Sequence, residues 1–563
     1  MKWPHALLIA AALASAAQAT PPADAPVSSV LTAPAHPETD PAALKAQVAG
    51  VLSRLASPAF KERQKAQADV ADLPAEALGL ITAASEDPSV DPEVRARLKE
   101  ALPGYEKKSL AKAAEAEAAR VRAWRRRLML AEYQKAGQHN PAWDAKVRAA
   151  ITSDTAGHTP GANEREEREH TRGLYQSAID AGCQDPLVLY RCVALTAVAT
   201  HDEGVARAAR CLKAADLFDA SDYPALEKMS CYLRAIDELS AYPRNDGQDA
   251  MLKQHYADLA LAGWPDLIRT AGVPDEFLVA LAGELRTKDP AYARVIGEHL
   301  LEDLRKQGLD SGRGGSAALK IIDARCQLAQ YWKGGYNPDD AFLNDLRGHM
   351  ETIRSLLEQA WAQNPVGSSA ATTMVEVEWI EGIVHRALGD RAADWPAGVG
   401  SRQAMETWFN RAIATNPDDW DACAYKLTYL EYFGDHPDKD MLAFGRQMFA
   451  TGRWTGRVPL MLIEAHRALA KQSGSVPDYF AQPAVWAEVK KCYQELMKHD
   501  PVPGFDASWY LTYAAYAGDW QTAAELCRQI GNHPAPAVFG GLQAYKDLRT
   551  KVFQRAAITS APG

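Results

Sequence analysis

A ten-residue phrase recurs in this chain, and it restricts the possible fold more than any other feature of the sequence. Its copies read LLEQAWAQNP, WFNRAIATNP and CYQELMKHDP. Each has a bulky residue, then Ala or Leu three positions later, then proline; the triplets are Leu357/Ala360/Pro365, Phe409/Ala412/Pro417 and Tyr493/Leu496/Pro501. A spacing of three places two side chains on one helix face, and proline cannot continue a helix. The phrase therefore predicts helices that each bury one face and then stop.

The phrase resembles the second helix of a tetratricopeptide repeat. Gly518-Asp519-Trp520 followed by Ala523 resembles the turn and the start of the second helix in the same family. The spacing departs from the family, because Pro417 follows Pro365 by 52 residues and precedes Pro501 by 84, against a period of about 34. The resemblance implies an irregular array of helical hairpins with a binding groove.

The part of the chain before these repeats is also helical by its pattern. The phrases LASPAFKERQKAQADVADL and DPSVDPEVRARLKEAL resemble HEAT-like helical pairs. Ser57-Pro58 and Asp91-Pro92 each supply a helix N-cap followed by proline at the first helical position. Residues 106–136 contain no Gly or Pro and predict one long helix. No useful strand-like alternation is present, so the predicted class is all-α, an irregular α-solenoid.

The composition shifts divide the chain into segments. We expect a signal peptide at 1–19, a Pro/Ala-rich linker at 20–41 and a HEAT-like region at 42–105. A long charged helix with a loop should follow at 106–164, and helical hairpins at 165–310. The rest should be a Gly-rich hinge at 311–316, tetratricopeptide-like repeats at 317–550 and a tail at 551–563.

The first nineteen residues predict export. Lys2 precedes an apolar run from Ala6 to Ala17, and Ala17-Gln18-Ala19 is an A-x-A cleavage site before Thr20. The apolar run is shorter than the roughly 20 residues that a membrane span needs. We therefore expect cleavage after Ala19, a periplasmic or secreted mature protein and no transmembrane span.

The charge balance and the cysteines exclude several functions. The net charge is −10, so the chain as a whole lacks the basic character of a nucleic-acid-binding protein. Its eight cysteines include no C-x-x-C pair, which disfavours a zinc ribbon or a thioredoxin-type site. Most of them occur in Ala/Leu-rich helical runs, where cysteine packs as a small apolar residue, and any disulfide is expected among the first four.

Three further patterns have ordinary structural interpretations. The arginines around Trp124 (Arg120, Arg122, Arg125, Arg126 and Arg127) lie mostly outside an apolar stripe and predict the solvated face of an amphipathic helix. The Gly-rich tract at 311–316 lacks the Lys-Ser/Thr of a phosphate loop. Glu378, Glu381 and His385 share a helix face and are a weak metal-site alternative, but we expect no metal and no cofactor because no second ligand cluster accompanies them.

Two aromatic clusters are the candidate binding residues. Tyr425, Tyr429 and Tyr432 share one helix face with Lys426 beside them, and Trp509, Tyr513 and Tyr516 share another. Tyrosine suits a recognition surface because it joins an apolar ring to a polar tip. The alternative is packing between helices. We predict partner binding at Tyr425, Tyr429, Lys426, Tyr432, Trp509 and Tyr513, with Tyr425 and Tyr429 facing an open groove.

The expected function is that of a binding or scaffolding module in the cell envelope, with a protein or peptide as partner. The stretches NPDDWDACAYKLTYLEYFGD and DMLAFGRQMFATGRW resemble an uncharacterised family of exported bacterial proteins with tetratricopeptide-like helices, which implies a class but no chemistry. Two alternatives stay open: a helical-frame enzyme such as a metal-dependent hydrolase, with Glu378, Glu381 and His385 as its centre, and a carbohydrate-binding helical array.

Overall fold

The structure is a computed structural model. It describes residues 41–74, 77–156, 164–198, 201–244, 247–270, 272–288, 316–331, 340–388, 399–499, 504–532 and 534–559. Within these ranges the regular elements are all helices, so the predicted all-α class is confirmed. The predicted signal peptide, nearly all of the predicted linker and all of the glycine-rich hinge except Ser316 lie outside the described residues.

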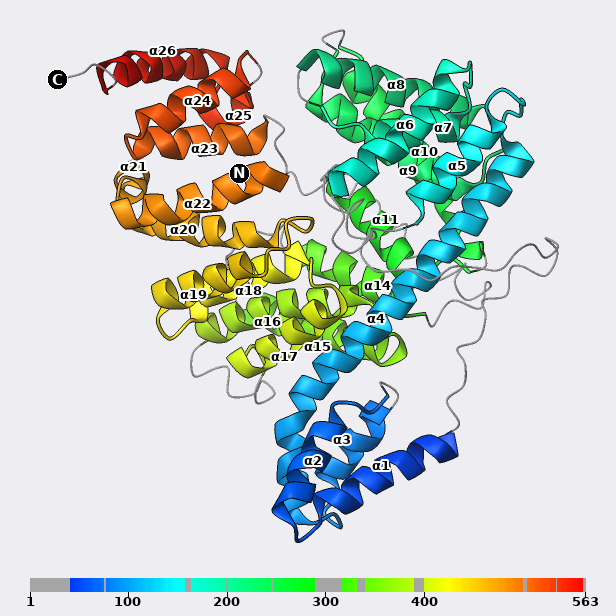
Figure 1. Cartoon of the computed structure of the whole chain (residues 1–563), viewed down its shortest axis with the longest axis vertical. Coiled ribbons are helices and arrows are strands. Elements are labelled where there is room, and N and C mark those ends of the chain that lie inside the picture. Colours follow the sequence, from blue (N-terminus) through cyan, green and yellow to red (C-terminus); the bar gives the residue numbers. More distant parts are fainter. Residues whose placement is uncertain are drawn as a thin grey trace.

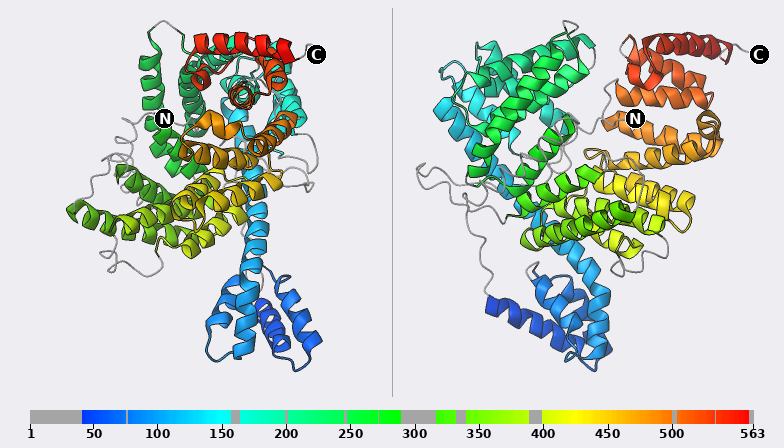
Figure 2. Two further views of the ribbon diagram at one scale, coloured as in Figure 1. Left: turned by 90° about the vertical axis from the view of Figure 1, so that its left-hand side faces the viewer. Right: turned by 180° about the vertical axis from the view of Figure 1, so that it is seen from behind.

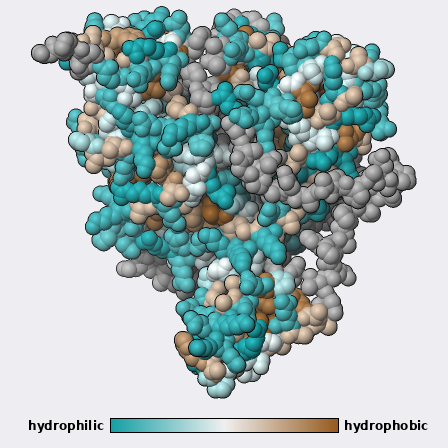
Figure 3. All heavy atoms as spheres, in the orientation of Figure 1, coloured by the Kyte–Doolittle hydropathy of each residue, from teal (hydrophilic) through white to brown (hydrophobic). Residues whose placement is uncertain are grey.

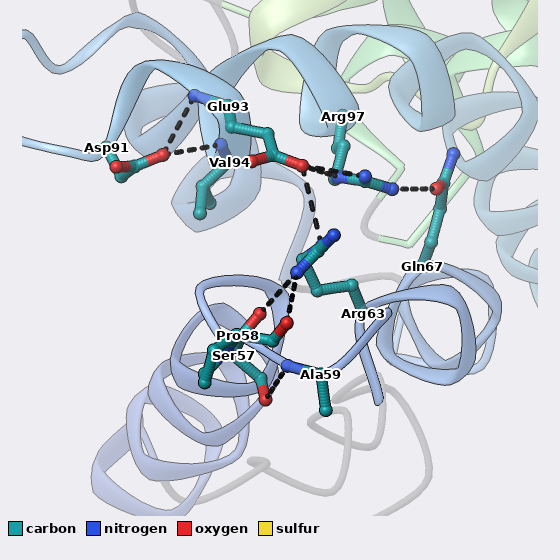
Figure 4. A network of polar contacts seen from close by, with 9 residues as sticks. All are labelled: Ser57, Pro58, Ala59, Arg63, Gln67, Asp91, Glu93, Val94 and Arg97. Carbon is teal, nitrogen blue, oxygen red and sulfur yellow. Dashed lines mark hydrogen bonds and ion pairs between the residues drawn. The ribbon is translucent and has the colours of Figure 1, made fainter. Parts of the chain in front are cut away.

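The N-terminal unit has a core of its own. It comprises α1 (Pro41–Leu55), α2 (Phe60–Val70), α3 (Leu78–Glu86) and the first turns of α4 (Pro92–Ala136). Leu55, Val70, Ile81 and Leu98 fill its centre. Figure 4 shows a polar network that links α2 to α4. Arg63 donates to the carbonyl oxygens of the α1–α2 turn and forms an ion pair with Glu93 of α4. Glu93 also pairs with Arg97.

The helix α4 runs unbroken across the predicted boundary at residues 105 and 106. Asp91 caps it as expected, accepting hydrogen bonds from the backbone N–H groups of Glu93 and Val94. Pro103 lies inside the helix without ending it. The cap predicted at Ser57 is wrong in detail, because α2 begins at Phe60 and the Ser57 hydroxyl instead accepts from Ala59 N in the preceding turn.

Helices packed in neighbouring pairs follow in the described part of the chain. The first arm consists of α5 (Asp144–Asp154), α6 (Glu164–Asp180), α7 (Pro186–Leu195), α8 (His201–Asp219), α9 (Ala225–Ala241), α10 (Asp249–Arg269) and α11 (Asp275–Lys288). The middle consists of α14 (Ala317–Tyr331), α15 (Asp340–Gln363), α16 (Ser368–Leu388) and α17 (Arg402–Thr415).

The second arm completes the series. It consists of α18 (Trp420–Phe433), α19 (Pro437–Ala450), the short η5 (Val458–Leu460), α20 (Met461–Gln472), α21 (Val476–Phe480), α22 (Pro483–His499), α23 (Phe505–Tyr516), α24 (Trp520–Ile530), α25 (Pro536–Phe539) and α26 (Leu542–Thr559). Among the described helices, most neighbours in sequence also contact each other, and α24 packs against α26. In Figures 1 and 2 the two arms diverge toward their ends, and α4 runs from the N-terminal unit along the first arm.

The recurring phrase behaves as its spacing predicts. Leu357, Ala360, Phe409 and Ala412 are buried, as are Tyr493 and Leu496. The helices α15 and α17 end just before Pro365 and Pro417, whereas Pro501 lies outside the described residues. The phrase is therefore a packing signal, in which a large side chain and a small one fill the space between neighbouring helices.

The arginine-rich half of α4 is less solvated than predicted. Trp124 packs edge-on against Phe277 of α11 as part of the expected apolar stripe. However, the Arg125 guanidinium also lies over the Phe277 ring, and Arg126 donates to the hydroxyl and the carbonyl oxygen of Thr155 at the end of α5. The predicted solvated face therefore does not extend to Arg125 and Arg126, because residues of α11 and at the end of α5 contact these side chains.

The outer surface is mixed. On the face drawn in Figure 3, hydrophobic residues are dispersed among hydrophilic ones. Among the helices that the structure describes, none combines the length and the apolar character needed to cross a membrane.

Candidate functional site

The first predicted cluster lies largely within the core. Tyr429 is buried, and its hydroxyl donates to the carbonyl oxygen of Gly400 at 2.9 Å. Tyr425 is half-buried and packs against the main core, while Tyr432 is 49% exposed. The prediction that Tyr425 and Tyr429 face an open groove is therefore wrong for Tyr429, because α16 and the 399–401 segment cover that side of α18.

Lys426 is also buried and serves packing. Its Nζ atom is 2.7 Å from Glu406 Oε2 and lies 4.1 Å from the centre of the Phe409 ring. Burial lowers the pKa of Lys426, while Glu406 opposes that shift. The ammonium group thus neutralises a carboxylate and stacks on an aromatic ring inside the fold, so the prediction of an accessible Lys426 is wrong.

The second cluster reaches the surface. On α23, Phe505, Trp509, Tyr513 and Tyr516 lie on one side, since their spacing of 4, 4 and 3 follows the helical period. Phe505 and Tyr516 are 44% and 38% exposed, and Trp509 is half-buried between them. Tyr513 is the exception: it is buried against Phe480, so the prediction of partner contact does not hold for that ring as packed here.

Arg467 of α20 contacts two rings of this row, Trp509 and Tyr513. Its guanidinium lies 4.4 Å from the centre of the Trp509 ring, and its Nε donates to the Tyr513 hydroxyl at 2.6 Å. Glu464 accepts a second hydrogen bond at 2.7 Å. Burial works against the charge of Arg467, but Glu464 and the neighbouring tyrosines outweigh it and raise its pKa. Arg467 thus stays charged and holds one side of the Trp509 ring in place.

An arginine in the turn before η5 has a strained backbone, and its side chain reaches the start of α23. Arg457 has a left-handed backbone with φ of +58°, the one non-glycine residue of positive φ among the described residues. Its Nη2 atom lies 2.5 Å from Asp506 Oδ2, next to the exposed Phe505. A side chain in this backbone region costs free energy, and such positions concentrate at functional sites.

We call the set of Arg457, Arg467, Phe505, Trp509 and Tyr516 the α20–α23 face. Its two guanidinium groups each have a carboxylate partner, Asp506 or Glu464, so the charges are locally balanced. What remains accessible is aromatic surface with polar edges. The Trp509 Nε1–H group does not belong to this accessible surface, because the atom is buried, although it has no hydrogen-bond acceptor among the described residues. Such a surface combines apolar rings with polar edges, which is a composition common at recognition surfaces.

Two of the residues named as a weak alternative metal site, Glu378 and Glu381, form an ion-pair cluster with an arginine. Arg354 of α15 donates through Nη2 to both Glu378 and Glu381 of α16, and Gly400 N donates to the remaining oxygen of Glu378 at 2.8 Å. Burial raises the pKa of Glu381 to about 7 even though Arg354 opposes the shift. His385 is half-buried one turn further on. These carboxylates face an arginine, which argues against a catalytic metal centre at this position.

Sequence reasoning missed the arginines of the α20–α23 face. Arg467 lies 42 residues before Trp509 in the chain, and nothing in its local pattern separates it from other helical arginines. Phe505 could have been found, because it continues the spacing of Trp509, Tyr513 and Tyr516 back by one turn. Arg457 lies in a turn whose left-handed conformation has no sequence signal.

The fold and this face define a class, the helical-repeat proteins of the α-solenoid type, in which consecutive helices stack on their neighbours. No protein-family model matches the chain, and no curated protein matches it significantly. Among solved structures, the chain is similar to a circular tandem repeat protein with novel repeat topology and enhanced subunit contact surfaces, at 12% identity and a TM-score of 0.19, over 88% of this chain and 99% of that one.

Proposed function

We propose that this chain is an exported, tetratricopeptide-like scaffolding protein of the cell envelope that binds a polypeptide partner through the α20–α23 face. Three features of the sequence support the class: the recurring phrase, the Gly518-Asp519-Trp520 turn and the secretory pattern of residues 1–19. In the structure, Asp519 caps α24 and Gly518 takes a positive φ, as that turn requires.

The observation that carries the proposal is the exposed aromatic row on α23. Phe505 and Tyr516 remain accessible at either end of Trp509, although the neighbouring rings Tyr510 and Tyr513 of the same helix are buried. Fixed aromatic rings beside arginine are typical of the residues that dominate protein interfaces. Because Arg467 already holds Trp509, little side-chain freedom is lost when a partner binds there.

A site-specific crosslink tests the binding face directly. A photoreactive phenylalanine analogue replaces Phe505 in the mature chain, and the protein is irradiated in extract of the envelope. The matched control places the same analogue at Phe60, which is 62% exposed but lies on the N-terminal unit. We expect one polypeptide adduct from position 505 that is absent from position 60. Equal crosslinking at both positions, or none at 505, contradicts the proposal.

Affinity measurements with that polypeptide show how much the exposed rings contribute to the binding free energy. Phe505→Ala and Tyr516→Ala should each leave the free energy of unfolding within about 1 kcal/mol, as surface substitutions usually do. The double variant should lose roughly 2 kcal/mol or more of binding free energy, about thirtyfold in Kd. Phe60→Ala should change neither quantity. Competition by soluble oligosaccharide with no polypeptide adduct would favour the carbohydrate-binding alternative instead.

Export is tested separately by N-terminal sequencing of the protein recovered from its cell. The expected first residue is Thr20. A protein that retains Lys2 would contradict the exported location without bearing on the α20–α23 face.

A further inference from the structure

The hairpin of α8 and α9 brings two cysteines to the same level. Cys211 precedes the end of α8 at Asp219 by 8 residues, and Cys231 follows the start of α9 at Ala225 by 6. With a rise of about 1.5 Å per residue, the two lie roughly 12 Å and 9 Å from the turn that joins the helices. Both belong to one core, and neither has exposed surface. The helices therefore place them across from each other.

The two thiol groups also interact. Cys231 and Cys211 are close enough to form a side-chain hydrogen bond. Other cysteines contact different groups: the sulfur of Cys192 approaches Gln176, that of Cys423 approaches Met448 and that of Cys492 approaches a backbone carbonyl oxygen. Cys211 and Cys231 are therefore a pair of thiols that the fold brings into mutual contact, although 20 residues separate them in the chain.

We propose that Cys211 and Cys231 form a disulfide when the chain folds in an oxidising compartment. This inference rests on the proposed export in one respect: export would bring the chain into the compartment where oxidation occurs. The oxidant is a disulfide-bearing donor, either a protein or glutathione. One cysteine thiolate attacks the donor disulfide and releases a thiol, and the second cysteine then attacks the mixed disulfide and releases the other thiol. Two protein thiols are oxidised, and one donor disulfide is reduced to two thiols.

The timing of this step follows from burial. In the folded, reduced chain, burial raises the pKa of the Cys231 thiol, and its contact with Cys211 adds to the effect. Only a thiolate attacks a disulfide, so the folded pair should react slowly. Oxidation should therefore occur while the hairpin assembles, before the core closes over both sulfurs.

Disulfide mapping after refolding tests the pairing. The mature chain is unfolded with reductant, then refolded in a buffer of oxidised and reduced glutathione, and free thiols are alkylated. Trypsin places Cys183, Cys192, Cys211 and Cys231 in separate peptides, at 173–191, 192–207, 211–213 and 229–234. We expect a linked pair of the last two peptides, and little linkage when folded reduced protein is given the same buffer.

Variants show whether the bond matters to the fold. Oxidised protein should melt several degrees above reduced protein, and Cys211→Ala and Cys231→Ala should each abolish that difference. Cys192→Ala, a matched control that empties a similar buried site, should lower the melting temperature but keep the difference between oxidised and reduced forms.

The outcomes separate the two proposals. Free thiols at Cys211 and Cys231 after oxidative refolding, or linkage of either to a different cysteine, overturn the inference. If the bond forms in refolding but the protein recovered from its cell is reduced and retains residues 1–19, the export proposal fails while the pairing stands.

Discussion

At the scale of single residues, side chains of the same type are buried or exposed according to where on the helix they lie. Tyr513 and Tyr516 are one turn apart on α23, yet the first is buried beneath Arg467 and the second is open to solvent. Lys426 resembles a surface residue in the sequence but neutralises Glu406 within the core. Burial, more than residue type, therefore decides which substitutions affect stability and which affect binding.

Phe409→Ala tests the packing role of the recurring phrase. The ring is buried, meets Phe444 edge-on and carries the Lys426 ammonium on its face. Its removal should cost roughly 3–5 kcal/mol of the free energy of unfolding, because a cavity forms and the buried cation loses its ring. Denaturant unfolding measures this loss. An unchanged midpoint would show that the phrase does not pack as described.

At the scale of elements, small residues and buried carboxyl groups shape the contacts between helices. Gly445 of α19 lets that helix approach α20 very closely. A methyl group there would stand 2.8 Å from the Leu462 Cα atom and 3.1 Å from the Met461 carbonyl oxygen. Backbone atoms cannot move aside as a flexible side chain can, so this contact fixes the distance between the two helices.

Gly445→Ala should consequently destabilise the protein by about 1–3 kcal/mol through overpacking. Gly348→Ala is the matched control, because that glycine lies within α15 with no atom near the position of an added methyl group. There alanine should stabilise the protein by roughly 0.5–1 kcal/mol through its better helix propensity. Thermal midpoints that move in the same direction for both variants would contradict the close approach of α19 and α20.

Two buried carboxyl groups, one on α4 and one on α9, interact electrostatically. Glu132 of α4 and Glu227 of α9 are 7% and 1% exposed. Both oxygens of Glu227 and one of Glu132 lack a hydrogen-bond partner among the described residues. Burial, with Glu227 nearby, raises the pKa of Glu132 to about 9, although Arg125 opposes the shift. Glu132 is therefore expected to be protonated in the folded protein at neutral pH.

This arrangement predicts a pH dependence of stability. A carboxyl group whose pKa is raised by folding stabilises the protein fully below its unfolded value, near 4.5, and that stabilisation is lost as the pH rises toward 9. Glu132→Gln mimics the protonated form, so its stability relative to wild type should increase between pH 5 and pH 9 by an amount on the order of a few kcal/mol. Denaturant unfolding at several pH values measures the difference. Parallel pH profiles for the two proteins would refute the assignment.

At the scale of the whole molecule, two cores share one helix. Leu98 of α4 lies in the core of the N-terminal unit, whereas Met129 and Tyr133 of the same helix lie in the core of the first arm. Between them, Arg411 of α17 pairs with Glu106 of α4 at 2.9 Å and ties the long helix to the middle of the solenoid. The N-terminal unit should therefore be able to open without unfolding the rest.

Leu98→Ala tests this independence. The truncation should cost about 2–5 kcal/mol within the N-terminal unit. Hydrogen exchange followed by mass spectrometry should show faster exchange in α1 to α3 and in the first turns of α4, but not in the solenoid helices. Phe409→Ala should give the reverse pattern, with faster exchange around α17 to α19. Uniform loss of protection in both variants would mean that the chain unfolds as one unit.

The sequence by itself determined the helical class, the ends of α15 and α17 and the buried positions of the phrase, because periodicity and proline act locally along the chain. It also indicated the aromatic row on α23. Only the tertiary structure decided that Tyr429, Lys426 and Tyr513 are buried, that Arg467 and Arg457 complete the α20–α23 face, and that Cys211 meets Cys231. Each of these depends on which helix packs against which, and residues far apart in the chain carry no local sign of that pairing.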